Sequence, residues 1–233
     1  MRVLAIETTE TTGSVAAACD GNLLLELKLS SEIRSAQSLA PGLKTLLERV
    51  GWRPTDVELV AVATGPGSFT GLRVGVTTAK TLAYCVGARI LGVDTLEVIA
   101  AAAPAEVERL WAAVDAQRGQ VVAQLFARGP EGHFLALAPA ELLDADLWLA
   151  RLAPATCLSG PVLRKLASRV PSHLTVLDPR YWSASAAAVA ELAVRRYRAG
   201  QRDDVWSVVP RYSRRSAAEE KWDAAGAPGK PGW

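Results

Sequence analysis

The chain has 233 residues, of which 50% are hydrophobic and 21% are charged, and its formal net charge is +2. This length allows one large domain or two small ones with a sizeable buried core, and the balance of apolar and charged residues excludes wholesale disorder. A net charge of +2 is too small for a surface that binds nucleic acid over its whole extent. Any contact with nucleic acid must therefore be local or be made by a partner.

The apolar stretches are all shorter than the ~20 residues that a membrane-spanning helix needs. The opening segment, residues 1–7, has only a brief apolar run before an acid, unlike the core of a signal peptide. Cys19, Cys85 and Cys157 are widely spaced without a CxxC pair, so we expect buried free thiols. These features predict a folded cytoplasmic protein with no membrane partner.

The first part of the chain alternates strand and helix patterns between turn and capping signals. Thr95 is the expected cap of the last helix in this part, and Pro104 ends that helix. The predicted elements are strands at 3–8, 14–19 and 23–29, a helix from 35 to 50, a strand at 59–64, a helix at 72–86, a strand at 89–93 and a helix before 104.

The same order of elements returns after Pro104. The predicted elements are strands near 110–115, 121–127 and 134–137, a helix at 140–152, a strand at 156–159, a helix at 161–170, a strand at 174–177 and a helix at 183–199. Three strands followed by helix, strand, helix, strand and helix form the unit of the two-domain α/β fold of actin, Hsp70 and sugar kinases. We therefore predict domains at 1–104 and 105–213, with the last segment able to pack back on the first domain, and a mobile tail at 214–233.

A glycine-rich loop, GPGSFTG, joins a predicted strand to a helix at residues 65–71. Gly65 and Gly67 allow close backbone approach, and with Ser68 and Thr70 they form a candidate phosphate-facing loop at a helix N-terminus. The P-loop and dinucleotide fingerprints both fail, because no Lys follows the last Gly and the spacing is GxGxxxG. A tight turn that packs the helix on the sheet therefore remains the alternative, with the Ser68 hydroxyl as helix cap.

The helix after this loop is apolar or small around nearly its whole circumference. Gly75, Ala79 and Ala83 recur every four residues and form one stripe on it. We predict that this stripe binds a partner helix, and the alternative is that it seats the helix on its own sheet.

The sequence resembles the TsaB (YeaZ) family over nearly its whole length. The specific match is GPGSFTGLRVGV from residue 65, followed by LGVDTL at 91–96. Weaker matches in the same order are LAIETT at 4–9, VDAQRG at 114–119, PRYSRR at 210–215 and AEEK at 218–221.

This resemblance implies a non-catalytic paralogue of TsaD, the subunit that moves a threonylcarbamoyl group from an adenylate onto the adenosine beside the tRNA anticodon. The expected partners are a TsaD-like subunit, a TsaE-like ATPase, a second copy when the chain is alone, and tRNA through the complex. No cofactor of its own is expected, and ATP, ADP or metal belong to the complex. Glu7 stands where the family usually has Asp, and Ser35 where it commonly has His, so neither catalytic residues nor metal ligands are expected.

Two enzymatic functions are alternatives to this scaffold role. A small-molecule kinase of the same fold would use Glu7 or Asp115 to hold magnesium or take a proton, but no Gly-rich second hairpin follows Asp115. A metal-dependent glycoprotease would need His133 and His173 to meet, although they lie far apart in the sequence.

The arginines between Arg195 and Arg215 have two interpretations that stay open. One is a solvated helix end, where cations favour the C-terminus. The other is a docking patch for tRNA phosphate or an acidic partner.

Overall fold

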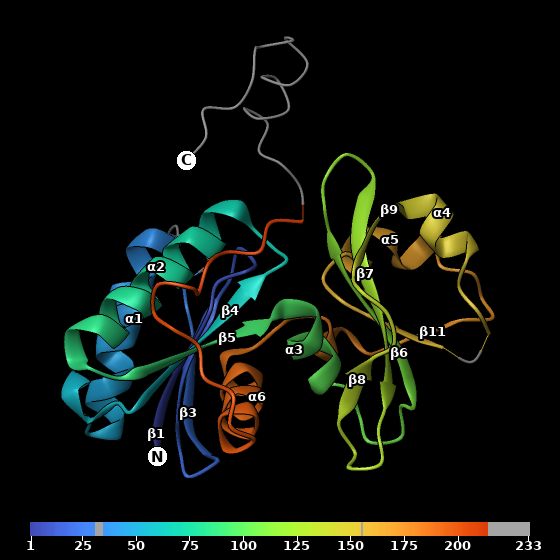
Figure 1. Ribbon diagram of the computed structural model, residues 1–233. Helices are drawn as coiled ribbons and strands as arrows, with labels where there is room; N and C mark the ends of the chain where they lie inside the picture. Colours follow the sequence, from blue (N-terminus) through green and yellow to red (C-terminus); the bar gives the residue numbers. More distant parts are fainter. Residues whose placement is uncertain (31–34, 155, 214–233) are drawn as a thin grey trace, which may run out of the picture.

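A computed structural model describes residues 1–30, 35–154 and 156–213 as a layered α/β protein (Figure 1). The strands are β1 Arg2–Glu7, β2 Ser14–Cys19, β3 Asn22–Lys28, β4 Leu59–Gly65, β5 Arg89–Asp94, β6 Arg109–Asp115, β7 Gln120–Arg128, β8 Phe134–Ala136, β9 Glu141–Asp144, β10 Cys157–Ser159 and β11 Thr175–Val176. The α-helices are α1 Ser35–Val50, α2 Phe69–Val86, α3 Thr95–Ala101, α4 Ala145–Ala150, α5 Leu163–Leu166 and α6 Ala186–Arg198. Short 3-10 turns lie at Pro54–Asp56, Ala167–Arg169 and Pro179–Tyr181. The predicted tail at 214–233 lies outside the described residues.

Two sheets repeat one strand order. The first sheet runs β3-β2-β1-β4-β5 and the second runs β8-β7-β6-β10-β11, so β6 takes the place of β1 and β10 that of β4. In each sheet the first three strands pair antiparallel and the later ones join in parallel. The predicted repeat of the strand pattern is therefore present in three dimensions. The division into domains at residue 104 stays a prediction.

The predicted helix at 140–152 is wrong in its first part, because residues 141–144 form strand β9. Leu142 and Leu143 pair antiparallel with Val122 and Val121 of β7. This pairing gives the backbone of 141–144 partners in the sheet, and α4 begins only after it. Asp144 then caps α4 by accepting from the amides of Asp146 and Leu147.

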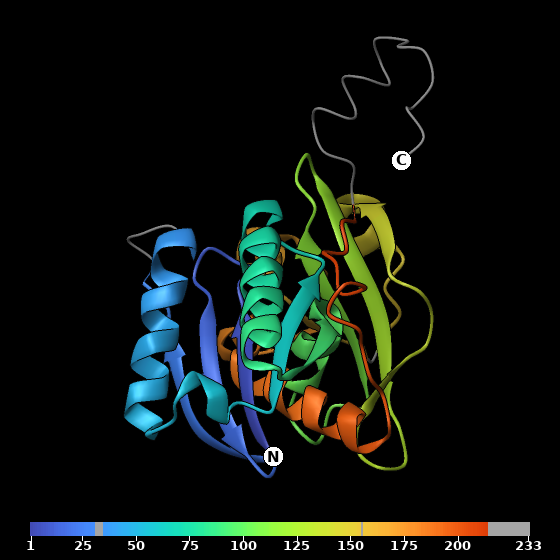
Figure 2. The same cartoon turned by 60° about the vertical axis from the view of Figure 1, so that its left-hand side comes forward.

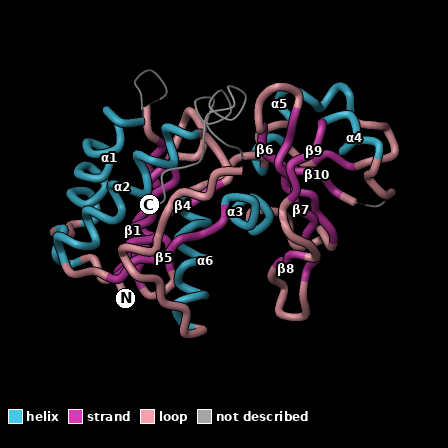
Figure 3. The backbone as a smooth tube through the Cα atoms, turned by 45° about the horizontal axis from the view of Figure 1, so that its top comes forward, coloured by secondary structure: helices cyan, strands magenta, loops and turns pink. Residues whose placement is uncertain are grey.

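The layers are α1 and α2, the first sheet, α3 and α6, the second sheet, and α4 and α5 (Figures 1 and 3). Alternation along β1 explains the two sides of the first sheet: Leu4 and Ile6 join the core under α1 and α2, while Val3 and Ala5 face the central layer. One central core, made by the inner faces of both sheets with α3 and α6, holds the two halves together.

Helix α6 belongs to the second half of the sequence but packs on the first sheet, opposite α1 and α2 (Figure 2). The Ser14 hydroxyl accepts from the amide of Ala186, and Glu26 accepts from the amide of Ala187. Strands β2 and β3 thus hold the N-terminus of α6 in place.

The residues after α6 also return to the first sheet (Figure 1). We call residues 203–213 the return segment. Asp203 forms a bridge with Ile90 of β5, and the amide of Arg211 donates to the carbonyl oxygen of Thr64 in β4 at 2.7 Å. The segment therefore covers the edge strand β5, which would otherwise leave unpaired backbone groups.

Two local predictions about the first half need correction. Asp94, not Thr95, caps α3, because its carboxylate accepts from the amides of Leu96 and Glu97. The cysteines are free as predicted but not buried, since Cys85 is exposed and Cys19 and Cys157 are half-buried. Among the described residues, no helix is long and apolar enough to cross a membrane.

Candidate functional site

The GPGSFTG loop connects β4 to α2, and its first two glycines are required for different reasons. Gly65 has φ +121°, and a Cβ there would lie 2.4 Å from the carbonyl oxygen of Arg211. Gly67 lies outside the left-handed region, but its Cβ would lie 2.6 Å from the Cβ of Thr9. The loop is therefore wedged between the return segment and the turn after β1.

Polar contacts fix the same loop to the turn after β1. The amide of Ser68 donates to the carbonyl oxygen of Thr9 at 2.7 Å, and the Thr8 hydroxyl donates to the carbonyl oxygen of Gly71 at 2.8 Å. The Ser68 hydroxyl accepts from the amide of Gly71 at 3.3 Å, which confirms the predicted cap. These bonds fix the loop to the turn after β1 and to the start of α2.

Glu7 ends β1 and is buried, with 1% of its surface exposed. Its carboxylate accepts from the backbone amide of Thr9 at 2.6 Å and from the Thr9 hydroxyl. Burial raises the pKa of Glu7 to about 7, because its effect is larger than that of the two hydrogen bonds from Thr9, which lower the pKa. The carboxyl group thus braces the turn that holds the glycine-rich loop.

A cleft of about 720 Å³ opens between the two halves beside this loop. Its lining residues are Thr9, Glu10, Thr11, Gly67, Ser68, Phe69, Thr70, Thr95, Val114, Asp115, Ala116, Gln117, Pro161, Arg164, Lys165, Tyr212 and Ser213. Three of the four candidate phosphate-facing residues line it, and Gly65 is the exception. A phosphate role for them stays a prediction.

Ion pairs already neutralise the charges of this cleft. Arg164 of α5 donates to Glu10 across the opening at 2.6 Å, and Lys165 binds Asp115 at the end of β6. Asp115 also accepts from the amide of Gln117 at 2.9 Å. The two cations and the two carboxylates of the lining thus face one another rather than an open anion site.

Comparison with known proteins identifies the family. A family model described as TsaD, tRNA N6-adenosine threonylcarbamoyltransferase, matches residues 31–147, half of the chain. The tRNA threonylcarbamoyladenosine biosynthesis protein TsaB of Bacillus subtilis is 35% identical over 130 residues, which cover 54% of this chain and 55% of that protein. The protein of the same name from Escherichia coli is 34% identical over 134 residues, 57% of this chain and 58% of that one. The chain belongs to the TsaB (YeaZ) family.

The match to a solved TsaB-family structure covers more of the molecule. YeaZ from Pseudomonas aeruginosa superposes with a TM-score of 0.78 at 25% identity, over 91% of this chain and 99% of that one. The predicted two-domain α/β fold of the actin, Hsp70 and sugar-kinase type is thereby confirmed. By sequence the chain spans a little over half the length of the curated relatives named above.

The strand-end carboxylates of this TsaB-family chain do not fit a metal-bound phosphate of the kind this fold can hold. Glu7 is buried against Thr9, and the described residues that line the cleft do not include it. Asp115 is paired with Lys165. In residues 1–30, 35–154 and 156–213, no group of three or more His, Cys, Asp or Glu side chains is placed to hold a metal ion, and His133 and His173 lie on separate loops.

The predicted partner stripe on α2 is wrong about which side of the helix faces out. Gly75, Ala79 and Ala83 are buried, and a Cβ on Gly75 would lie 2.2 Å from the Thr8 hydroxyl. These small residues let α2 approach its own sheet, which was the alternative interpretation.

The outward face of α2 is formed by other residues than the predicted stripe, and these residues are also uncharged. Val74, Thr78, Thr81 and Cys85 follow a spacing of four, three and four and lie at the half-buried to exposed surface. We call these four residues the outer stripe. It has no charged side chain, which is uncommon for the solvent side of a helix.

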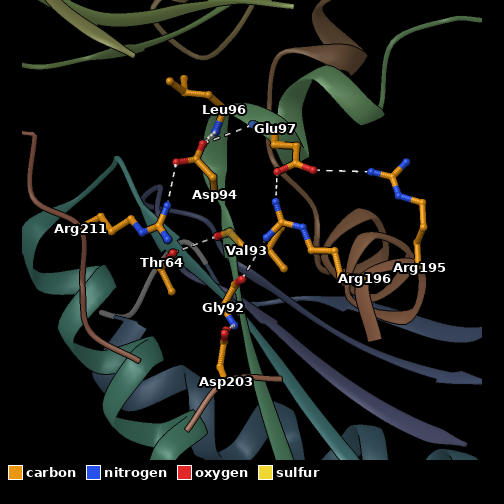
Figure 4. Close-up of polar contacts among 10 residues, drawn as sticks. All are labelled: Thr64, Gly92, Val93, Asp94, Leu96, Glu97, Arg195, Arg196, Asp203 and Arg211. Carbon is orange, nitrogen blue, oxygen red and sulfur yellow. Dashed lines mark hydrogen bonds and ion pairs between the residues drawn. The ribbon is translucent and has the colours of Figure 1, made fainter. Parts of the chain in front are cut away.

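Most arginines after residue 194 bind within the chain (Figure 4). Arg195 and Arg196 both pair with Glu97 of α3, and Arg196 also donates to the carbonyl oxygen of Gly92 at 3.2 Å. Arg211 lies 3.9 Å from Asp94. Burial raises the pKa of Asp94, and the hydrogen bonds from the amides that it caps act against this rise. Arg214 and Arg215 lie outside the described residues. These ion pairs hold α6 and the return segment in place, which neither sequence interpretation included.

The brace at Glu7 is a feature that the sequence interpretation missed. The sequence interpretation allowed the last segment to pack back on the first domain, but it did not give the course of the return segment along β5 and α2. Val205 and Val208 were the available signal, since both pack on the core that contains Val76 and Ala79 of α2. The position of their partner strand was not encoded locally.

Proposed function

We propose that the chain is a non-catalytic subunit that binds and supports a TsaD-like subunit in the threonylcarbamoyladenosine modification of tRNA. Its membership of the TsaB family carries this proposal. Glu7 supports it, because the carboxyl group at the strand end braces a turn instead of pointing into the cleft. ATP, ADP or a metal ion then belong to the assembled complex and not to this chain.

The outer stripe of α2 is the proposed seat for the TsaD-like partner. Its threonine, valine and cysteine side chains need little desolvation, and no charge has to be buried when another helix packs on them. The similarity of residues 31–147 to the TsaD family itself supports a partner of related fold. In its absence the same stripe would pair two copies of this chain, and a TsaE-like ATPase and tRNA would join through the complex.

Reconstitution tests the role. The purified chain, a purified TsaD-like subunit, a TsaE-like ATPase with ATP, threonylcarbamoyl-adenylate and tRNA are combined, and modified adenosine is measured by mass spectrometry. We expect no product from the chain alone and full product only when the TsaD-like subunit and its accessory ATPase are present. ATP-dependent phosphorylation of a small molecule by the chain alone would instead favour the kinase alternative.

Substitution of the outer stripe tests the seat. Thr81→Arg places a charge at the centre of the stripe and should abolish capture of the TsaD-like subunit. Thr175→Arg is the matched control, because Thr175 is also exposed but lies on β11 of the second sheet. Equal capture by both variants would place the interface elsewhere.

A further inference from the structure

Large aromatic side chains are exposed along the line where the return segment meets α2. Trp206 is 70% exposed, Tyr84 is 69% exposed and Tyr212 is 41% exposed. Val209, 55% exposed, lies between the two aromatic residues of the return segment in the sequence. The buried Val208 anchors the segment from beneath, so these outward side chains are held on a firm support.

The aromatic side chains form two groups, one near each end of α2. Tyr212 stacks on Phe69 with ring centroids 4.1 Å apart, at the N-terminus of the helix. Trp206 lies 5.8 Å from Tyr84 near the C-terminus. With a rise of ~1.5 Å per residue, Phe69 and Tyr84 are separated by roughly 20 Å along the helix axis.

Cations occupy the same line. Arg73 lies over the Phe69 ring at 4.3 Å and donates to the Tyr212 hydroxyl at 2.9 Å. Lys80 donates to the carbonyl oxygen of Trp206 at 3.3 Å. The side chain of Arg211 is 70% exposed. We call this line, made by Phe69, Arg73, Lys80, Tyr84, Trp206, Val209, Arg211 and Tyr212, the aromatic strip.

The two neighbouring aspartates are each held by a backbone amide. Asp203 accepts from the amide of Gly92 at 2.9 Å, and Asp204 accepts from the amide of Trp206 at 2.7 Å. Arg73 and Lys80 are the cations beside the exposed rings, since Arg211 pairs with Asp94.

We propose that the aromatic strip binds single-stranded RNA. Exposed rings stack on bases without regard to sequence, and cations between them contact the phosphates. A separation of ~20 Å between two ring groups suits a strand of a few nucleotides better than the compact central anchor of a protein interface. The strip lies beside the outer stripe of α2, so RNA and a partner helix would occupy different sides of one helix. This goes beyond the proposed function, in which tRNA is reached only through the complex.

The test is fluorescence anisotropy with a labelled octauridylate and the full chain alone. Trp206→Ala and Tyr84→Ala should each weaken binding roughly tenfold, the loss expected for one base stack. Lys80→Gln should lower the slope of log K against log salt by about 0.7, the value for one phosphate contact with a single strand. Leu147→Ala and Lys44→Gln are matched controls, because Leu147 on α4 and Lys44 on α1 are exposed away from the strip.

Circular dichroism establishes that each variant is folded. If Trp206→Ala releases the return segment, Tyr84→Ala still tests the strip, because Tyr84 lies on helix α2. Parental affinity in both aromatic variants would overturn the proposal. So would loss of capture of a purified TsaD-like subunit by Trp206→Ala with unchanged RNA binding, because the strip would then be a protein interface. Thr81→Arg should lose that partner and keep octauridylate, so failure of the partner proposal leaves the RNA result interpretable.

Discussion

Glu7 is the residue whose role changes most between sequence and structure. At the end of an apolar strand, a carboxylate is expected to point toward a ligand, and Glu differs from Asp by one methylene group. Here that longer side chain folds back onto Thr9 and is sealed from solvent. The residue therefore contributes to the geometry of the glycine-rich loop.

Protonation of Glu7 should make stability depend on pH. Its folded pKa of about 7 lies above the ordinary 4.5, so folded and unfolded chains are both protonated below pH 4.5. As pH rises from there to about 7, only the unfolded chain loses the proton, and the free energy of unfolding falls. At ~1.4 kcal/mol per pH unit, the total loss is about 3.5 kcal/mol.

Glu7→Gln checks this expectation, because the amide keeps an acceptor for Thr9 without the charge. Urea unfolding at pH 5 and pH 8 should show a smaller loss of stability in the variant than in the parent. An identical pH dependence in both chains would show that Glu7 does not titrate in this range.

The two loop glycines give a second prediction at this scale. Gly65→Ala and Gly67→Ala should each lower the free energy of unfolding by about 1 to 3 kcal/mol, the first through positive φ and a clash, the second through a clash alone. Gly87→Ala is the control for φ, since Gly87 has φ +69° with open space around it. Calorimetry should rank it as the mildest of the three, and a Gly67 variant as stable as the parent would contradict the wedge.

At the scale of elements, helix α2 shows what a sequence pattern leaves undecided. Its even distribution of small and apolar residues predicts two covered sides, of which the structure shows the one on the sheet. It does not say which side meets the sheet, because Gly75 and Ala79 suit either neighbour. The deciding contact, with the Thr8 hydroxyl, comes from a residue more than sixty positions away.

The orientation of α2 predicts opposite outcomes for two arginine substitutions on one helix. Ala79→Arg would bury an unpaired charge and lower the free energy of unfolding by about 3 to 5 kcal/mol, or prevent folding. Thr81→Arg should melt within a few degrees of the parent, because its side chain reaches solvent. Circular dichroism melts compare the two directly, and a stable Ala79→Arg chain would contradict the packing described here.

Other elements differ in how far the sequence predicted them. Strands β1, β2 and β4 were predicted nearly to the residue because they are continuous apolar runs between strong turn signals. Strand β9 was missed because its four residues read as the start of a helix, and pairing with β7 decides otherwise. In the candidate site, the loop and its Ser68 cap were predictable from local chemistry. The burial of Glu7 and the course of the return segment depend on contacts between distant parts of the chain.

At the scale of the whole molecule, the two halves share one core. Helix α6 and the return segment cover the first sheet, and α3 packs against β6 of the second. A boundary at residue 104 therefore divides the two sequence repeats, but the two halves still share one hydrophobic core.

This arrangement predicts that residues 1–104 alone will not fold. Without α6, the inner face of the first sheet would expose Val3, Ala5 and Leu91, all fully buried in the whole chain. We expect no cooperative urea transition for this fragment and a parental one for residues 1–213, which retain α6. A cooperative transition of the short fragment, at the midpoint of the whole chain, would show that the halves are independent.

The late position of α6 also bears on how the protein is made. The ribosome releases the five strands of the first sheet long before the helix that covers their inner face. In that interval the nascent chain presents an apolar surface of the kind that chaperones bind and that promotes aggregation. Native packing of the N-terminal sheet must then wait until α6 has been synthesised, and docking of this helix becomes the step that commits the sheet to its fold.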